Sequence, residues 1–229
     1  MRKLAPMRIV PFRKGDRRKR KPLDQAQIVR AALALLDEVG LDELTMRRLA
    51  ERLGVQAASL YRHVRNKDEL LMLLGDEISG EIPFPNPSAG WRDQLIEAAW
   101  NVRRGLGAHR DGARVLASTA PFGPRRLRHI DNMLGILRAA GLSDRDAVRA
   151  AYHANNFVTE FAADEARFGS ASRKQSADMR KMFKSLPQSD YPNIVALAEH
   201  LAFDDMDALF EFGIEMWLQG IRAFSRSKR

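Results

Sequence analysis

Two short helical segments meet at Gly54, within residues 45–66. The first segment places apolar side chains at helical spacing, at Met46, Leu49, Ala50 and Leu53. Glycine directly after such a stripe commonly ends a helix, because it adopts the left-handed conformation without a steric penalty. The second segment is short and largely polar, which is atypical of a core helix. The pattern predicts a helix-turn-helix, a motif that presents its second helix to the major groove of DNA.

The second segment carries side chains suited to a DNA groove. Apart from the apolar Leu60, its residues are Gln56, Ala57, Ala58, Ser59, Tyr61, Arg62 and His63. Small side chains let a helix approach the groove floor, whereas hydroxyl, guanidinium and imidazole groups bond base edges and phosphates. Arg62 is a candidate base reader, because a guanidinium forms two parallel bonds to guanine. A phosphate contact without sequence preference is the alternative for this residue.

The helices on either side of the motif complete a small helical unit. Asp24 and Gln27 have the spacing of a capping box, and Asn66 and Glu69 repeat it. Apolar residues at helical spacing follow each of these caps. We therefore expect a three-helix DNA-binding domain over residues 24–80, with a fourth helix that runs to about Gly80.

The net charge of the chain lies in its first 23 residues. These hold ten Lys or Arg side chains and a single Asp, which accounts for the whole formal charge of +9. Such a segment cannot bury a core, so we expect a disordered arm over residues 1–23. Arg17, Arg18 and Arg20 are candidates for contacts to phosphates or to the adjacent minor groove. The alternatives are a solubilising tail or an over-long translation start, because Met7 is a second candidate start.

A break rich in proline, Pro83–Gly90, marks the domain boundary. Helical patterns resume beyond it, and we expect an all-α second domain over residues 81–229. The expected helices cover residues 91–105, 108–118, 124–140, 144–168, 190–202 and 205–225. Residues 169–192 are polar and contain two prolines, so they predict a long connection with one helical turn at 177–184.

Composition excludes several other classes of protein. No run of about 18 apolar residues is present, and no secretory signal pattern follows the basic start. The chain has no cysteine, and its five histidines lack the spacing of paired metal ligands. No Gly-x-Ser-x-Gly turn is present to carry a nucleophile. We expect a cytoplasmic, nucleoid-associated protein that is not an enzyme, does not enter a membrane and needs neither a metal nor a cofactor.

Two stretches of the motif are Leu-Thr-Met-Arg-Arg-Leu-Ala-Glu-Arg-Leu-Gly-Val and Ser-Leu-Tyr-Arg-His-Val-Arg-Asn-Lys. They resemble the DNA-binding domain of the TetR family of transcriptional regulators. His109–Val115, Gly141–Ser143 and Phe212–Glu215 extend the resemblance to the tetracycline repressor subgroup and its C-terminal domain. The resemblance implies operator contacts from Arg47, Ser59, Tyr61, His63 and Lys67. Thr45, which caps the first helix of the motif, is a further candidate. Ala57, Ala58 and Arg62 depart from that subgroup, so we expect a different operator sequence.

The resemblance also implies a homodimer and a small-molecule effector. The last helix offers Leu209, Phe210, Gly213, Ile214, Trp217 and Ile221 as candidate interface residues. Two copies of this helix and of the helix over 144–168 suit a four-helix interface. The alternative is that these residues form an ordinary intramolecular core.

In the tetracycline repressor subgroup, a set of side chains holds a magnesium–tetracycline complex. The resemblance places the corresponding positions of this chain near Pro83, Ala98, Val102, Leu116, Thr119, Met133 and Asp164. Only Thr119 is kept and Asp164 is a shortened acid, so we expect a more apolar or aromatic effector without the metal. The candidate wall residues are Trp100, Asn101, Thr119, Met133, Asn155, Asn156, Glu160 and Asp164. Packing or surface positions are the alternative for each of them.

These features predict a repressor that binds palindromic operator DNA as a homodimer and is released by an apolar or aromatic effector. The alternative is a constitutive, nonspecific architectural DNA-binding protein, in which the basic arm dominates and no ligand is held. Salt dependence separates the two, because a specific repressor keeps its preference for one site at physiological salt.

Overall fold

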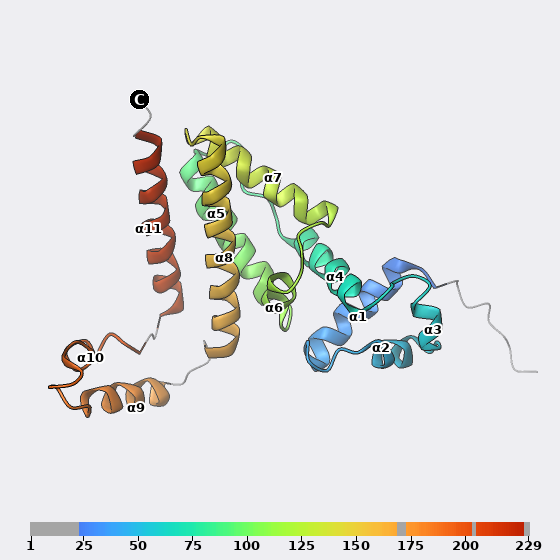
Figure 1. Cartoon of the computed structure of the whole chain (residues 1–229), viewed down its shortest axis with the longest axis horizontal. Helices are drawn as coiled ribbons and strands as arrows, with labels where there is room; N and C mark the ends of the chain where they lie inside the picture. Colours follow the sequence, from blue (N-terminus) through green and yellow to red (C-terminus); the bar gives the residue numbers. More distant parts are fainter. Residues whose placement is uncertain (1–22, 169–172, 203–204, 227–229) are drawn as a thin grey trace, which may run out of the picture.

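The computed structural model describes residues 23–168, 173–202 and 205–226. Over these ranges the chain forms eleven α-helices and no strand, which confirms the all-α prediction (Figure 1). The basic arm with Arg17, Arg18 and Arg20 lies outside the described residues. No described helix is both long and apolar enough to cross a bilayer.

Four helices form the N-terminal head. In Figure 1 the head lies at one end of the molecule's long axis, and α11 lies at the other end. They are α1 (Gln25–Val39), α2 (Met46–Leu53), α3 (Ala57–Leu60) and α4 (Lys67–Glu81). Side chains from all four, with Ile28, Leu36, Leu49, Leu60 and Leu74 fully buried, make one core. Burial of these side chains is the main stabilisation of so small a unit.

The predicted helix caps of the head are confirmed, except that the side chain of Glu69 accepts from the amide of Arg65 and not from that of Asn66. Asp24 and Gln27 form a reciprocal capping box at the start of α1. The hydroxyl of Thr45 accepts a bond from the amide of Arg48 at 3.2 Å, and the side chain of Asn66 accepts one from Glu69 at 2.8 Å. Gly54 ends α2 with φ 64°, in the left-handed region where a β-carbon is unfavourable. These caps fix where each helix begins and therefore how the exposed turn after α2 is presented.

Seven helices form the C-terminal body. They are α5 (Trp91–Gly107), α6 (Gly112–Ala117), α7 (Pro124–Ala139), α8 (Asp144–Phe168), α9 (Arg173–Lys184), α10 (Pro192–Ala196) and α11 (Met206–Arg226). A second core lies between α5, α7, α8 and α11, with Leu95, Leu137 and Phe210 fully buried. Helix α4 leaves the head and packs against α5, α6 and α7, so it belongs to both halves of the molecule (Figure 1).

The stretch between α8 and α11 differs from its prediction. Helix α9 has 12 residues where a single turn within a loop was expected, and α10 has five residues where a helix over 190–202 was expected. The prediction was wrong for α9 because it depended on an apolar stripe, whereas this helix is polar and packs mainly on α10. Helix α10 is short because the backbone leaves the helical conformation at Leu197. Both helices extend away from the body in Figure 1.

Candidate DNA interface and effector cavity

Helix α3 and the turn after it carry half of the expected DNA-contacting residues. Tyr61 is 51% exposed although it is a large aromatic residue, and Arg62 is exposed beside it. Nη2 of Arg62 donates to Oγ of Ser59 at 3.3 Å, which holds the guanidinium along α3. Arg47 is also exposed and lies 3.6 Å from Glu51 on its own helix. A surface aromatic residue next to solvated arginines is suited to a polyanionic partner.

Other expected DNA-contacting residues have bonds within the head. The hydroxyl of Thr45 caps α2, and Nζ of Lys67 donates to the carbonyl of Leu41 at 3.3 Å. His63 is partly buried, and its carbonyl accepts a bond from Gln25. Ala57 and Ser59 are partly buried, and Ala58 is exposed. Helix α3 is a single turn, so these residues are presented by one tight turn and the bend after it.

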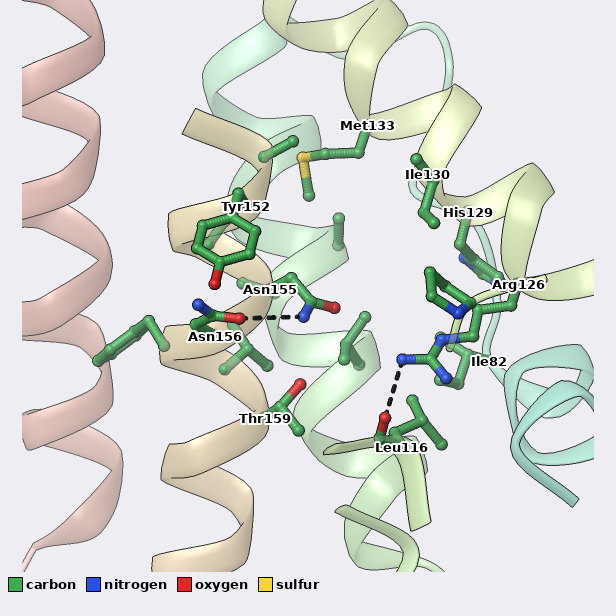
Figure 2. Close-up of a pocket in the computed structure, with 18 of the residues that line it drawn as sticks. Ile82, Leu116, Arg126, His129, Ile130, Met133, Tyr152, Asn155, Asn156 and Thr159 are labelled. Atoms are coloured by element: carbon green, nitrogen blue, oxygen red, sulfur yellow. Dashed lines mark hydrogen bonds between the residues drawn. The ribbon is translucent and has the colours of Figure 1, made fainter. Parts of the chain in front are cut away.

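A cavity of about 490 Å³ lies in the body, between α5, α6, α7, α8, α11 and the end of α4. Its wall is largely apolar, with Ile82, Leu116, Ile130 and Met133 among the lining residues (Figure 2). This volume lies within the range of pockets for small organic molecules, roughly 300 to 1,000 Å³. The cavity therefore has the size and the character of a ligand site.

Five of the eight candidate wall residues line this cavity, namely Thr119, Met133, Asn155, Asn156 and Glu160. The other three do not line it. Trp100 packs edge-on against Phe210 with ring centres 5.1 Å apart, and Asn101 donates to the carbonyl of Pro83 at 3.2 Å. Asp164 lies 3.7 Å from Arg167, one turn further along α8. These three side chains therefore make contacts elsewhere in the body.

Sequence reasoning missed several polar residues of the wall. Arg126 and His129 lie on α7, and Tyr152 and Thr159 lie on α8. Figure 2 shows the two α7 side chains on one side of the cavity, with Tyr152, Asn155 and Asn156 opposite. Arg126, His129 and Met133 recur at helical spacing, so the sequence does indicate that they share one face of the helix. The sequence did not show that this face of α7 turns inward.

Arg126 is a partly buried cation in the cavity wall. Its guanidinium donates to the carbonyl of Thr119 at 3.2 Å, to the hydroxyl of Thr119 at 2.9 Å and to the carbonyl of Leu116 at 2.9 Å. These bonds satisfy acceptors at the end of α6. Burial lowers the pKa of the Arg126 guanidinium, against the opposing charge of Asp76.

His129 contributes a neutral ring to the same side of the cavity. Its Nε2 lies 2.8 Å from the carbonyl of Ser79, and Phe84 stacks on it with ring centres 4.3 Å apart. Burial lowers the pKa of His129, an effect that the bond to Ser79 opposes and the charge of Arg128 adds to. The imidazole is therefore uncharged at neutral pH, with Nε2–H donating to the carbonyl.

The N-terminus of α7 is capped by a carboxylate from α4. Oδ1 of Asp76 accepts bonds from the amides of Arg125 and Arg126 at 2.8 and 3.0 Å. Gly123 makes this approach possible, since a β-carbon there would overlap the carboxylate of Asp76. The carboxylate also complements the positive end of the α7 dipole. The helix that leaves the head is thus bonded to the start of a cavity helix.

A turn before α6 forms a second connection between head and body. Oδ2 of Asp111 accepts a bond from the amide of Leu41 at 2.8 Å, and Arg110 donates to the carbonyl of Glu38 at 2.8 Å. The two bonds join this turn to the end of α1 and to the residues just after it. Asp111 adopts φ 59°, a conformation that its short polar side chain tolerates. His109 lies in the same turn, between the carboxylates of Asp37 and Glu81.

The candidate interface residues of α11 divide into two groups. Phe210, Ile214 and Ile221 are buried within the chain itself, whereas Leu209, Gly213 and Trp217 are partly buried. A different apolar set faces solvent, with Phe212 65%, Met216 63% and Phe224 61% exposed. Val148 and Tyr152 on α8 are also exposed.

Within the described residues, no group of three His, Asp or Glu side chains could hold a metal ion.

The head and the cavity-bearing body together define a two-domain regulator with a DNA-binding and a ligand-binding half. The chain belongs to the TetR family: the model "Bacterial regulatory proteins, tetR family" matches residues 28–73, and "Tetracyclin repressor-like, C-terminal domain" matches residues 84–224. This confirms the resemblance drawn from the motif, and with it a DNA-binding, ligand-binding transcriptional regulator of a repressor family.

The chain is similar to a tetracycline repressor protein and to TetR-family proteins whose structures hold different ligands. It is 38% identical to the class A tetracycline repressor protein from transposon 1721 of Escherichia coli, over 85% of this chain and 88% of that one. ActR of Streptomyces coelicolor in complex with actinorhodin has a TM-score of 0.81 and 38% identity, over 90% and 99% of the two chains. A single-residue variant of TetR from Acinetobacter baumannii AYE in complex with minocycline has a TM-score of 0.68 and 32% identity, over 89% and 95%.

Proposed function

We propose that the protein is a homodimeric repressor that binds a palindromic operator and is released when a small, largely apolar effector fills the cavity. One observation carries this proposal: the helix that leaves the DNA-binding head, α4, also forms part of the cavity wall and caps α7. A ligand that displaces α7 therefore acts on the helix that positions the head. We place this action on the nucleoid, in the cytoplasm.

The dimer is supported by the apolar residues that α8 and α11 expose. Phe212 and Met216 on α11 are each more than half exposed. Val148 and Tyr152 on α8 are exposed as well, at the cavity that they line. Exposed apolar side chains on a long helix suit a symmetric interface with the same residues of a second copy. Such a dimer presents two heads to two half-sites, about one turn of DNA or roughly 34 to 36 Å apart.

The coupling between cavity and head is a shift between two states. Arg125 and Arg126 donate their amides to Asp76, and Arg125 also pairs with Glu77 of α4. An effector that favours a different position of α7 favours a different tilt of α4 and a different spacing of the heads. The effector must bind one state more tightly than the other, by roughly one kcal/mol or several, to release the DNA.

The experiment that tests the proposal is a selection of bound DNA from a random library at physiological salt, with the full-length protein. Recovery of one palindrome supports a sequence-specific dimer and provides the probe for release experiments. Recovery of DNA without a shared motif contradicts it and favours the architectural alternative, in which the basic arm dominates binding.

A further inference from the structure

We infer that the effector is an organic anion: an apolar, ring-bearing molecule whose carboxylate or ionised phenol pairs with the guanidinium of Arg126. This inference rests on the proposed function, because it names the chemistry of the ligand that fills the same cavity. It predicts which molecules enter the site and which neutral analogues are excluded.

The guanidinium of Arg126 lies in the cavity wall and bonds only neutral acceptors among the described residues. Its three bonds go to two carbonyls and one hydroxyl, and within the described part of the chain none of its partners is a carboxylate. A guanidinium has five N–H donors, so two remain for a ligand. A partly desolvated guanidinium with unused donors favours a charge-assisted hydrogen bond, and an anionic ligand supplies its acceptor.

The acidic groups near Arg126 do not replace such a ligand. The carboxylate of Asp76 keeps its charge, which acts on Arg126, but its hydrogen bonds go to the backbone amides at the start of α7 and not to the guanidinium. Glu160 lines the cavity as well, yet its side chain is exposed and screened by solvent. His129 is neutral at neutral pH, so Arg126 is the positive charge among the described lining residues.

The remainder of the wall selects an apolar body with oxygen substituents. Met133, Ile130 and Leu116 provide the apolar surface, whereas Asn155, Asn156 and Thr159 lie across the cavity from Arg126 (Figure 2). Nδ2 of Asn155 lies 3.5 Å from Oδ1 of Asn156, which is long for a hydrogen bond. Most of the hydrogen-bonding capacity of the two amides therefore stays available to a ligand. An acid at one end and carbonyl or hydroxyl groups at the other match this arrangement.

The competing explanation is that Arg126 only closes the C-terminal end of α6. Its bonds to Leu116 and Thr119 fit that role. A structural cap makes no distinction between charged and neutral ligands, whereas an anion site does. The two explanations therefore differ in a binding preference that can be measured without any mutation.

The test uses two fluorescent probes of nearly equal shape, anthracene-2-carboxylate and anthracene-2-carboxamide, titrated into the full-length protein at pH 7.5 without DNA. We expect the carboxylate to bind at least about tenfold more tightly, as a hydrogen-bonded charge pair predicts. Equal affinity for both probes overturns the anion inference and leaves the operator proposal standing. Binding of neither probe counts against the inference and against an aromatic effector, whereas the DNA selection still tests operator binding on its own.

Variants locate the preference on one side chain. We expect Arg126→Gln to bind the two probes with similar affinity and Arg126→Lys to keep part of the preference, because the charge is kept. The matched control is Arg128→Gln, an exposed arginine on the same helix that does not line the cavity. If Arg126→Gln keeps the full preference for the carboxylate, Arg126 is not the anchor. Operator binding by each variant shows whether it folds.

Discussion

At the scale of single residues, His109 connects the ends of two helices through its two ring nitrogens. Nδ1 lies 3.1 Å from Asp37 at the end of α1, and Nε2 lies 2.9 Å from Glu81 at the end of α4. Burial by itself lowers the pKa of His109, but hydrogen bonds to Glu81 and Asp37 and their charges outweigh burial, so the pKa is raised above 6.5. The imidazolium is the form that both carboxylates stabilise.

The raised pKa of His109 predicts a stability that depends on pH. A group with a raised pKa in the folded state stabilises the fold fully below its unfolded pKa, and this contribution is lost as pH rises through the folded pKa. We expect His109→Gln to cost about 1 kcal/mol at most at pH 5.5, because Asp37 and Glu81 are partly exposed, and less at pH 8.5. Urea unfolding at the two pH values measures this, and an equal cost at both would contradict it.

A second residue-scale prediction concerns base recognition by Arg62. The side chain is exposed and lies along α3 through its bond to Ser59. We expect Arg62→Ala to relax the selected sequence at one guanine in each half-site, worth roughly 1 to 3 kcal/mol of discrimination. The same DNA selection on Arg30→Ala, an exposed arginine of α1, is the control. Uniform weakening without a change of motif would assign Arg62 to a phosphate instead.

At the scale of helices, the close approach of α4 to the start of α7 depends on a missing β-carbon. Gly123→Ala would drive that atom into the carboxylate of Asp76, so we expect a loss of about 1 kcal/mol or more and a weakened response to effector. Gly135 lies in the exposed interior of α7 with nothing near its β-carbon position. Gly135→Ala is thus expected to stabilise by about 0.5 to 1 kcal/mol. Thermal unfolding compares the pair, and equal effects would argue against the contact.

The helices and their caps could be predicted largely from the sequence, because Asp24, Thr45 and Asn66 act within four residues of themselves. The cavity wall could be predicted only in part. Met133 and Asn155 were expected there, but Arg126 was not, because its role depends on the rotation of α7 against α4 and α6. That rotation is fixed by Asp76, a residue 50 positions earlier in the chain. Contacts at such separations leave no local periodicity to detect.

At the scale of the whole molecule, the exposed apolar faces of α8 and α11 predict a dimer that can be disrupted by charge. We expect Met216→Glu to shift the protein toward monomer in sedimentation velocity and to weaken operator binding, because like charges would meet near the symmetry axis. The control is Met179→Glu, an exposed methionine on α9. An unchanged dimer in Met216→Glu would exclude this face as the interface.

The basic arm gives the last prediction, although it lies outside the described residues. Deletion of residues 1–21 removes ten basic side chains, so we expect weaker operator binding and a shallower dependence of log affinity on log salt. Each lost phosphate contact reduces the slope by about 0.9. The motif recovered in the DNA selection should stay the same. An unchanged slope would show that the arm does not contact DNA.

The bond between α4 and α7 has a consequence for how regulators of this shape diversify. On the α7 side, the acceptor Asp76 bonds main-chain amides, and its approach requires only that residue 123 lack a β-carbon. Every amino acid except proline provides such an amide. The residues that face the ligand can therefore be exchanged, and a new signal recognised, while the connection that carries the signal to the head is kept.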